Sequence, residues 1–176
     1  MFGHISISTE KVISIRMPET SARKYKVAFI CTRNACRSQI AEALAKDLAS
    51  DIIEPLSGGT DPSEGIDPGA VEAMKEIGID ISHMRPKRLP KEVLDSLDLV
   101  VHMGCGPPGS CMTAPGIPYE DWGLEDPAGK SLEEYRMTVR EIERRVRDLA
   151  SRLRSGRLPS VSASQMTFEL STSDTS

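Results

Sequence analysis

The sequence lacks a surplus of positive charge, a long apolar run and a recognisable export signal. Its net charge of -4 argues against a basic nucleic-acid-binding protein. No apolar run approaches the roughly 18 residues that a membrane-spanning helix needs. Residues 1–15 have no basic start, no apolar block and no small-residue cleavage site. We therefore predict a cytoplasmic protein that contacts neither membranes nor nucleic acids.

Cysteine is scarce as well, and the four residues fall into two pairs: Cys31 with Cys36, and Cys105 with Cys111. In a cytoplasmic protein we expect reduced thiols and no structural disulfide framework. Four and five residues separate the members of each pair, whereas zinc sites usually separate paired cysteines by two. A zinc site is therefore the weaker interpretation, and we predict no bound metal and no cofactor.

Composition divides the chain into three parts. In residues 1–24 polar and apolar residues alternate only weakly, and this segment is predicted to be a weakly structured extension. Residues 155–176 are rich in Ser and Thr and are predicted to be a disordered tail. Residues 25–154 are predicted to fold as one domain. We expect strands at 26–30, 52–57, 97–103 and 117–122, and helices at 38–50, 68–77, 90–96 and 131–154. This alternation predicts an α/β domain of three layers, with a four-stranded parallel sheet flanked by helices on both faces.

The segment Cys31-Thr-Arg-Asn-Ala-Cys-Arg-Ser38 joins the first strand to the first helix. A loop of this length can direct its backbone N–H groups at one tetrahedral oxyanion, and the helix adds its positive N-terminal end. Arg37 can bind two anion oxygens, and the same field favours a thiolate nucleophile at Cys31. Ser38 is expected to donate a hydrogen bond to that thiolate, and Asn34 to adopt a left-handed backbone. The predicted oxyanion-binding residues are Thr32, Arg33, Asn34, Ala35, Cys36, Arg37 and Ser38. The alternative is a buried cysteine beside a surface arginine.

Cys105 and Cys111 follow the third predicted strand in a segment rich in Gly and Pro. Because loops that follow parallel strands meet at one edge of the sheet, we expect both thiols near Cys31. Two thiols near a reactive thiolate suggest exchange chemistry, in which one attacks a sulfur atom and its neighbour resolves the disulfide. The alternative is a pair of incidental thiols.

Asp126 precedes Pro127 in the loop before the last helix. A carboxylic acid near the bound oxyanion can protonate a departing oxygen atom. Taken alone, an Asp-Pro pair is an ordinary turn signal, but the Cys31 loop favours the catalytic interpretation. His102, in the third strand, is predicted to be packed or to cap the strand.

With these motifs, residues 26–154 resemble the arsenate reductases that are coupled to thioredoxin, which share the fold of low-molecular-weight protein tyrosine phosphatases. The resemblance rests on residues 31–42, 66–68, 77–82 and 122–129. Gln39 resembles the reductase branch, because the phosphatases usually have Pro there. Ala128 follows the Asp-Pro pair where the phosphatases tend to carry aromatic residues, and it suits a small inorganic oxyanion.

The resemblance implies that Cys31 attacks arsenate held by the loop and Arg37, while Asp126 protonates the leaving hydroxide. Cys105 then attacks Cys31 in the arsenic adduct and releases arsenite. Finally Cys111 attacks Cys105 and carries the disulfide to thioredoxin or a similar dithiol protein. The expected role is arsenic detoxification by a monomer, with phosphate or sulfate as competing oxyanions and with residual phosphatase activity.

Three positions show where the sequence departs from or follows this family's pattern. Arg33 stands where many members have Gly, and an extra Gly104 precedes the first relay cysteine. Cys36 matches a cysteine that takes no part in the relay.

Some members bind potassium beside the loop. Asn34, Glu42 and Ser57 match that site, but Lys87 stands where an Asp is expected. We hypothesise that the Lys87 ammonium takes over the role of the ion.

Two other functions remain open on sequence grounds. A phosphatase of the same fold needs only Cys31, Arg37 and Asp126. A redox-sensing or oxyanion-binding module would use Cys105 and Cys111 as a switch.

Overall fold

The computed structural model describes residues 23–106 and 110–159. The predicted extension at residues 1–24 and the predicted tail at residues 155–176 lie mostly outside the described residues. In chain order the elements are β1 (Tyr25–Cys31), α1 (Arg37–Leu48), β2 (Ile53–Gly59), α2 (Pro68–Glu76), α3 (Lys91–Leu94), β3 (Leu99–His102), β4 (Tyr119–Asp121) and α4 (Leu132–Arg154). None of the helices in these ranges is long and apolar enough to cross a membrane.

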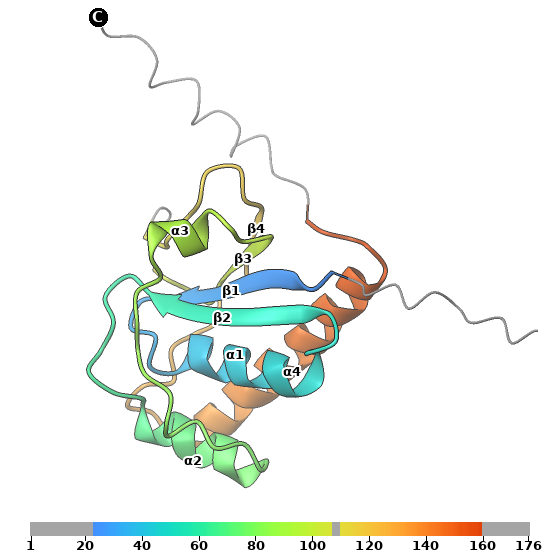
Figure 1. The fold of residues 1–176 in the computed structure, drawn as a ribbon. Coiled ribbons are helices and arrows are strands. Elements are labelled where there is room, and N and C mark those ends of the chain that lie inside the picture. The colour runs from blue at the N-terminus through green and yellow to red at the C-terminus, as the bar shows by residue number, and fades with distance from the viewer. Residues whose placement is uncertain (1–22, 107–109, 160–176) are drawn as a thin grey trace, which may run out of the picture.

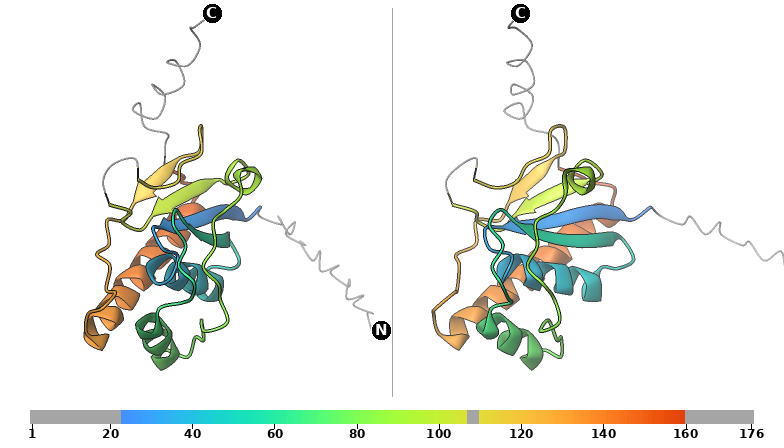
Figure 2. Two further views of the ribbon diagram at one scale, coloured as in Figure 1. Left: turned by 90° about the vertical axis from the view of Figure 1, so that its left-hand side faces the viewer. Right: turned by 60° about the vertical axis from the view of Figure 1, so that its left-hand side comes forward.

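The four strands form one parallel sheet in the order β2-β1-β3-β4. Helices α1, α2 and α4 lie on one face, and the short α3 lies on the other (Figure 1; Figure 2). The register pairs Cys31 with Gly59, Ile30 with His102, and His102 with Asp121. All four strands therefore end at the same edge, where ligands bind in sheets of this kind. The predicted fold is confirmed; within the described ranges the second face is covered by the four-residue α3 and adjoining loops.

The central strand β1 forms because its apolar run is buried on both faces of the sheet. Val27, Ala28, Phe29 and Ile30 are all fully buried, as expected for a strand covered from both sides. Phe29 and Val27 belong to the larger core under α1 and α4, whereas Ala28 and Ile30 pack on the α3 side. The strand is thus held rigidly up to its last residue, the nucleophile candidate.

Helix α4 begins at a capping box formed by Ser131 and Glu134. The Ser131 hydroxyl accepts a hydrogen bond from the Glu134 N–H, and the Glu134 carboxylate accepts one from the Ser131 N–H. Its buried residues recur every three or four positions along the helix, which gives one apolar stripe facing the core. They are Tyr135, Val139, Ile142, Val146, Leu149, Ala150 and Leu153.

Strands β1 and β2 run further than their residue types predict. The predicted ends at residues 30 and 57 become Cys31 and Gly59. Glycine has a low strand propensity, yet Gly59 is required here because a Cβ atom would lie 2.6 Å from the Thr32 carbonyl oxygen. Because Gly59 has no Cβ atom, the loop after β1 can approach β2 closely.

Candidate active site

The nucleophile candidate, Cys31, ends β1 and is only 2% exposed. Its Sγ accepts a hydrogen bond of 3.2 Å from the backbone N–H of Asn34 and lies 2.9 Å from Ser38 Oγ. The Asn34 side-chain amide donates to that same hydroxyl at 2.8 Å. Ser38 Oγ therefore uses a lone pair for Asn34, and its own hydrogen is available to the sulfur. Two hydrogen-bond donors are therefore directed at one sulfur atom.

Asn34 shapes the loop as predicted, with a left-handed φ of 50° and no exposed surface. Three further contacts hold it. The Gln39 side-chain amide donates to the Asn34 backbone oxygen and to its Oδ1, each at 3.0 Å, and the Lys87 N–H donates to Oδ1 at 2.9 Å. Helix α1, the loop and the segment before α3 are thereby tied together behind the nucleophile.

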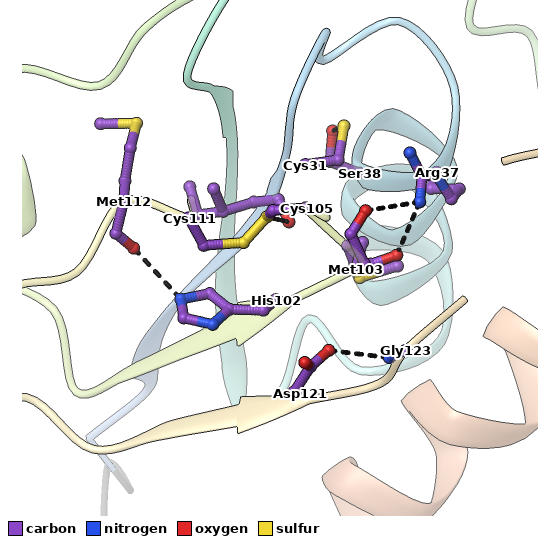
Figure 3. Close-up of a disulfide and its surroundings, with 12 residues drawn as sticks. Cys31, Arg37, Ser38, His102, Met103, Cys105, Cys111, Met112, Asp121 and Gly123 are labelled. Atoms are coloured by element: carbon purple, nitrogen blue, oxygen red, sulfur yellow. Dashed lines mark hydrogen bonds between the residues drawn. A yellow bond between two sulfur atoms is a disulfide. The ribbon is translucent and has the colours of Figure 1, made fainter. Parts of the chain in front are cut away.

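Arg37 is 5% exposed, and its guanidinium is held by backbone carbonyls from two loops. Nη1 donates to the oxygens of Met103, Gly104 and Leu124 at 3.0, 2.7 and 2.8 Å, and Nη2 donates to Asp126 Oδ2 at 3.2 Å. These contacts fix the orientation of the guanidinium, and Figure 3 shows Arg37 beside Met103. The sequence did not reveal them, because a carbonyl acceptor carries no residue-type signal.

Asp126 lies beside the nucleophile loop, where it contacts Arg37. Its Oδ1 accepts a hydrogen bond of 3.1 Å from the Ala128 N–H, and its side chain is 41% exposed. One cavity joins it to the loop; the lining residues are Cys31, Arg33, Ala35, Cys36, Arg37, Asp67, Asp126 and Ala128. The structure therefore brings together the predicted nucleophile, anion-binding arginine and acid.

Asp67 caps α2, since its carboxylate accepts a hydrogen bond of 2.9 Å from the Gly69 N–H. Its side chain also lines the cavity and accepts hydrogen bonds of 2.9 and 2.8 Å from the Tyr135 hydroxyl. Burial, together with the Asp67 carboxylate, raises the pKa of the Cys36 thiol far above its ordinary value. Cys36 is therefore kept protonated beside the reactive loop.

The second pair of cysteines, Cys105 and Cys111, forms a disulfide with Cα atoms 5.3 Å apart, while Cys31 and Cys36 are free (Figure 3). Cys105 Sγ lies 3.5 Å from the carbonyl oxygen of Ile30. That oxygen belongs to the residue immediately before Cys31. The expectation that the two cysteine-bearing loops meet at one sheet edge is confirmed.

Lys87 reaches the residues that the resemblance assigns to potassium. Its ammonium lies 3.5 Å from Glu42 Oε2 and 3.4 Å from Ser57 Oγ, and the Ser57 hydroxyl donates to Glu42. Glu42 and Ser57 are both buried. A tethered ammonium already neutralises the carboxylate, so these residues do not fit a bound potassium ion.

Comparison with known proteins identifies the family. The model of the low molecular weight phosphotyrosine protein phosphatase family matches residues 26–158. The chain belongs to this family. Arsenate reductase 2 of Staphylococcus haemolyticus is 38% identical over 130 residues, which cover 73% of this chain and 98% of that protein.

Two solved structures extend the comparison. An arsenate reductase in the phosphate-binding state is 38% identical, covers 73% of this chain and 98% of its own, and superposes with a TM-score of 0.63. A thioredoxin-dependent arsenate reductase of Corynebacterium glutamicum is 36% identical, covers 78% and 65%, and gives a TM-score of 0.64. The resemblance predicted from the motifs is confirmed.

Proposed function

We propose that the protein reduces arsenate to arsenite with a cysteine nucleophile and an intramolecular thiol–disulfide relay. The observation that carries the proposal is the position of the Cys105–Cys111 disulfide at the sheet edge that presents Cys31. A phosphatase needs the nucleophile loop but has no use for this pair. The relatives that match over most of the chain are named arsenate reductases, which supports the same activity.

The first step joins sulfur to arsenic. Arsenate binds to the loop N–H groups and to Arg37, whose charge offsets that of the oxyanion. The Cys31 thiolate attacks arsenic, and the departing hydroxide takes a proton from Asp126 and leaves as water. Arsenic is still pentavalent in this adduct.

The second step carries the reduction. The Cys105 thiolate attacks Cys31 Sγ, and the electron pair of the sulfur–arsenic bond passes to arsenic, which leaves as trivalent arsenite. The product is a Cys31–Cys105 disulfide. The Cys111 thiolate then attacks Cys105 Sγ and expels Cys31 as a thiolate, which leaves the Cys105–Cys111 disulfide seen in the structure.

Thioredoxin or a similar dithiol protein supplies the two electrons that reduce the Cys105–Cys111 disulfide. Cys105 and Cys111 are both half-buried, so the disulfide lies near the surface that a protein reductant must reach. The enzyme works as a monomer in the cytoplasm, where free thiols are maintained. Phosphate and sulfate compete for the loop because they share the tetrahedral shape of arsenate.

The test is a coupled assay with arsenate, thioredoxin, thioredoxin reductase and NADPH. We expect NADPH consumption by the wild type and by Cys36→Ser, and none above background for Cys31→Ser, Cys105→Ser or Cys111→Ser. Cys36→Ser is the matched control because it removes a thiol from the same loop and keeps the backbone N–H through which that position would bind an oxyanion. Turnover that survives loss of Cys105 or Cys111 would refute the relay.

A phosphatase is the second candidate, because Cys31, Arg37 and Asp126 line one cavity. It would hydrolyse phosphate monoesters through a cysteinyl phosphate on Cys31. Hydrolysis of p-nitrophenyl phosphate that is unaffected by Cys105→Ser, in a protein without arsenate turnover, would select this function.

A further inference from the structure

His102 connects the sheet to the relay segment through its imidazole ring. It is the last residue of β3 and is 7% exposed. Its Nε2 lies 3.1 Å from the carbonyl oxygen of Met112, and Figure 3 shows the ring directed toward that oxygen. A carbonyl oxygen can only accept, so Nε2 carries the hydrogen and donates it.

The ring is held in place by the sheet. It stacks on Tyr119 of β4, with centroids 4.8 Å apart and an interplanar angle of 24°. The His102 carbonyl accepts a hydrogen bond of 2.8 Å from the Trp122 N–H, and the residue is paired with Ile30 of β1. Burial lowers the pKa of His102 from its ordinary value, which keeps the ring neutral. The sheet therefore holds the donor, His102 Nε2, in place.

The hydrogen bond spans the base of the disulfide loop. His102 lies three residues before Cys105, and Met112 directly follows Cys111. The contact closes the chain between residues 102 and 112 without using either sulfur atom. We propose that His102 is a positioning residue of the relay, which keeps the Cys111 end of the segment beside Cys105 whether or not the disulfide is formed.

The step that depends on this placement is the resolution of the Cys31–Cys105 disulfide, so the inference rests on the proposed relay. Cys111 loses its proton to solvent, its thiolate bonds to Cys105 Sγ, and Cys31 leaves as a thiolate. No electrons are gained or lost overall. Holding Cys111 near its target raises its effective concentration and therefore speeds the exchange.

Two substitutions separate the hydrogen bond from packing. His102→Leu fills the site with apolar atoms but cannot donate, whereas His102→Gln keeps an N–H donor on a chain of similar reach. His83→Leu is the control, because it alters an exposed histidine away from the relay.

The first measurement uses a Cys31→Ser, Cys36→Ser background, in which only the relay pair can form a disulfide. In glutathione redox buffers we expect His102→Leu to lower the equilibrium constant for the Cys105–Cys111 disulfide, because the reduced segment gains freedom that disulfide formation must remove. One net hydrogen bond sets the upper limit of this effect at about fivefold. His102→Gln should stay within about twofold of the unsubstituted background, and His83→Leu should equal it.

The second measurement is a single turnover of arsenate by the four-cysteine protein, quenched by alkylation and read by mass spectrometry. His102→Leu should accumulate the Cys31–Cys105 disulfide, and His102→Gln should not. The proposal is overturned if His102→Leu behaves as wild type in both measurements, or if Gln and Leu are impaired equally. The redox equilibrium needs no arsenate, so a protein without arsenate turnover refutes the proposed function and leaves this test intact.

Discussion

Replacing Lys87 with methionine removes the ammonium that faces the buried carboxylate of Glu42. The two groups are 3.5 Å apart, and Glu42 also accepts the hydroxyl hydrogen of Ser57. After the substitution, the mostly buried charge of Glu42 keeps one neutral donor, Ser57, and the more distant, exposed ammonium of Lys46. We therefore expect a loss of stability.

The size of the loss follows from the exposure of the two partners. Breaking a fully buried ion pair costs about 3–5 kcal/mol, and an exposed pair contributes about 0–1 kcal/mol. The Glu42 side chain is 11% exposed, but that of Lys87 is 42% exposed, so we expect an intermediate value of about 2 kcal/mol. For a protein of this size that corresponds to a fall in Tm of about 4–8 °C.

Lys46→Met is the matched control. Lys46 lies 3.8 Å from the other oxygen of the same carboxylate, but its side chain is 68% exposed, so its removal should cost less than about 0.5 kcal/mol. The assay is thermal and urea unfolding of the three proteins, with arsenate turnover of the wild type in matched KCl and NaCl. Equal losses for the two lysines, or wild-type turnover several-fold faster in potassium, would refute the role given to Lys87.

Three further predictions concern the nucleophile loop. Gly59→Ala should lower the free energy of unfolding in urea by about 1–3 kcal/mol and weaken inhibition by phosphate, because the new Cβ atom would meet the Thr32 carbonyl oxygen. Unchanged stability would contradict the close approach of Thr32 to Gly59. Asp126→Asn should lower kcat about 100-fold with little change in KM, as expected for loss of a general acid. A wild-type kcat for this variant in steady-state kinetics would contradict that role for Asp126. The raised pKa of Cys36 keeps it a thiol at pH 8, so iodoacetamide should label Cys31 and spare Cys36 in peptide mapping of the reduced protein; equal labelling would contradict this.

Most of the fold could be predicted because its signals are local. The apolar run of β1, the Asp67 cap of α2 and the capping box of α4 each act within a few residues, and the structure contains all three. The strand ends could not be predicted as well. The pairing of Gly59 with Cys31 depends on a backbone approach across strands, and glycine's low strand propensity points the other way.

The candidate site also has features that the sequence predicts and features that it does not. The spacing of Cys31, Arg37 and Ser38 predicts an oxyanion loop because a strand, a loop and a helix are adjacent in the chain. The partners of Gln39 could not be predicted from that spacing, since it donates to both oxygens of Asn34. A proline at this position has no side-chain donor, so Gln39 supplies loop contacts that the usual phosphatase residue would not.

Arg37 contacts both the nucleophile loop and the segment that leads to Cys105. The guanidinium that lines the cavity with Cys31 also donates to the carbonyls of Met103 and Gly104, the two residues before Cys105. Gly104 permits this contact because its φ is +95° and any Cβ would lie 2.4 Å from a carbonyl oxygen of the next loop. Gly104, the extra residue before Cys105, thus lets one arginine line the proposed oxyanion site and hold the backbone that leads to Cys105. With His102 of β3 contacting the residue after Cys111, the chain is held on both sides of the disulfide, by Arg37 of α1 before Cys105 and by His102 after Cys111.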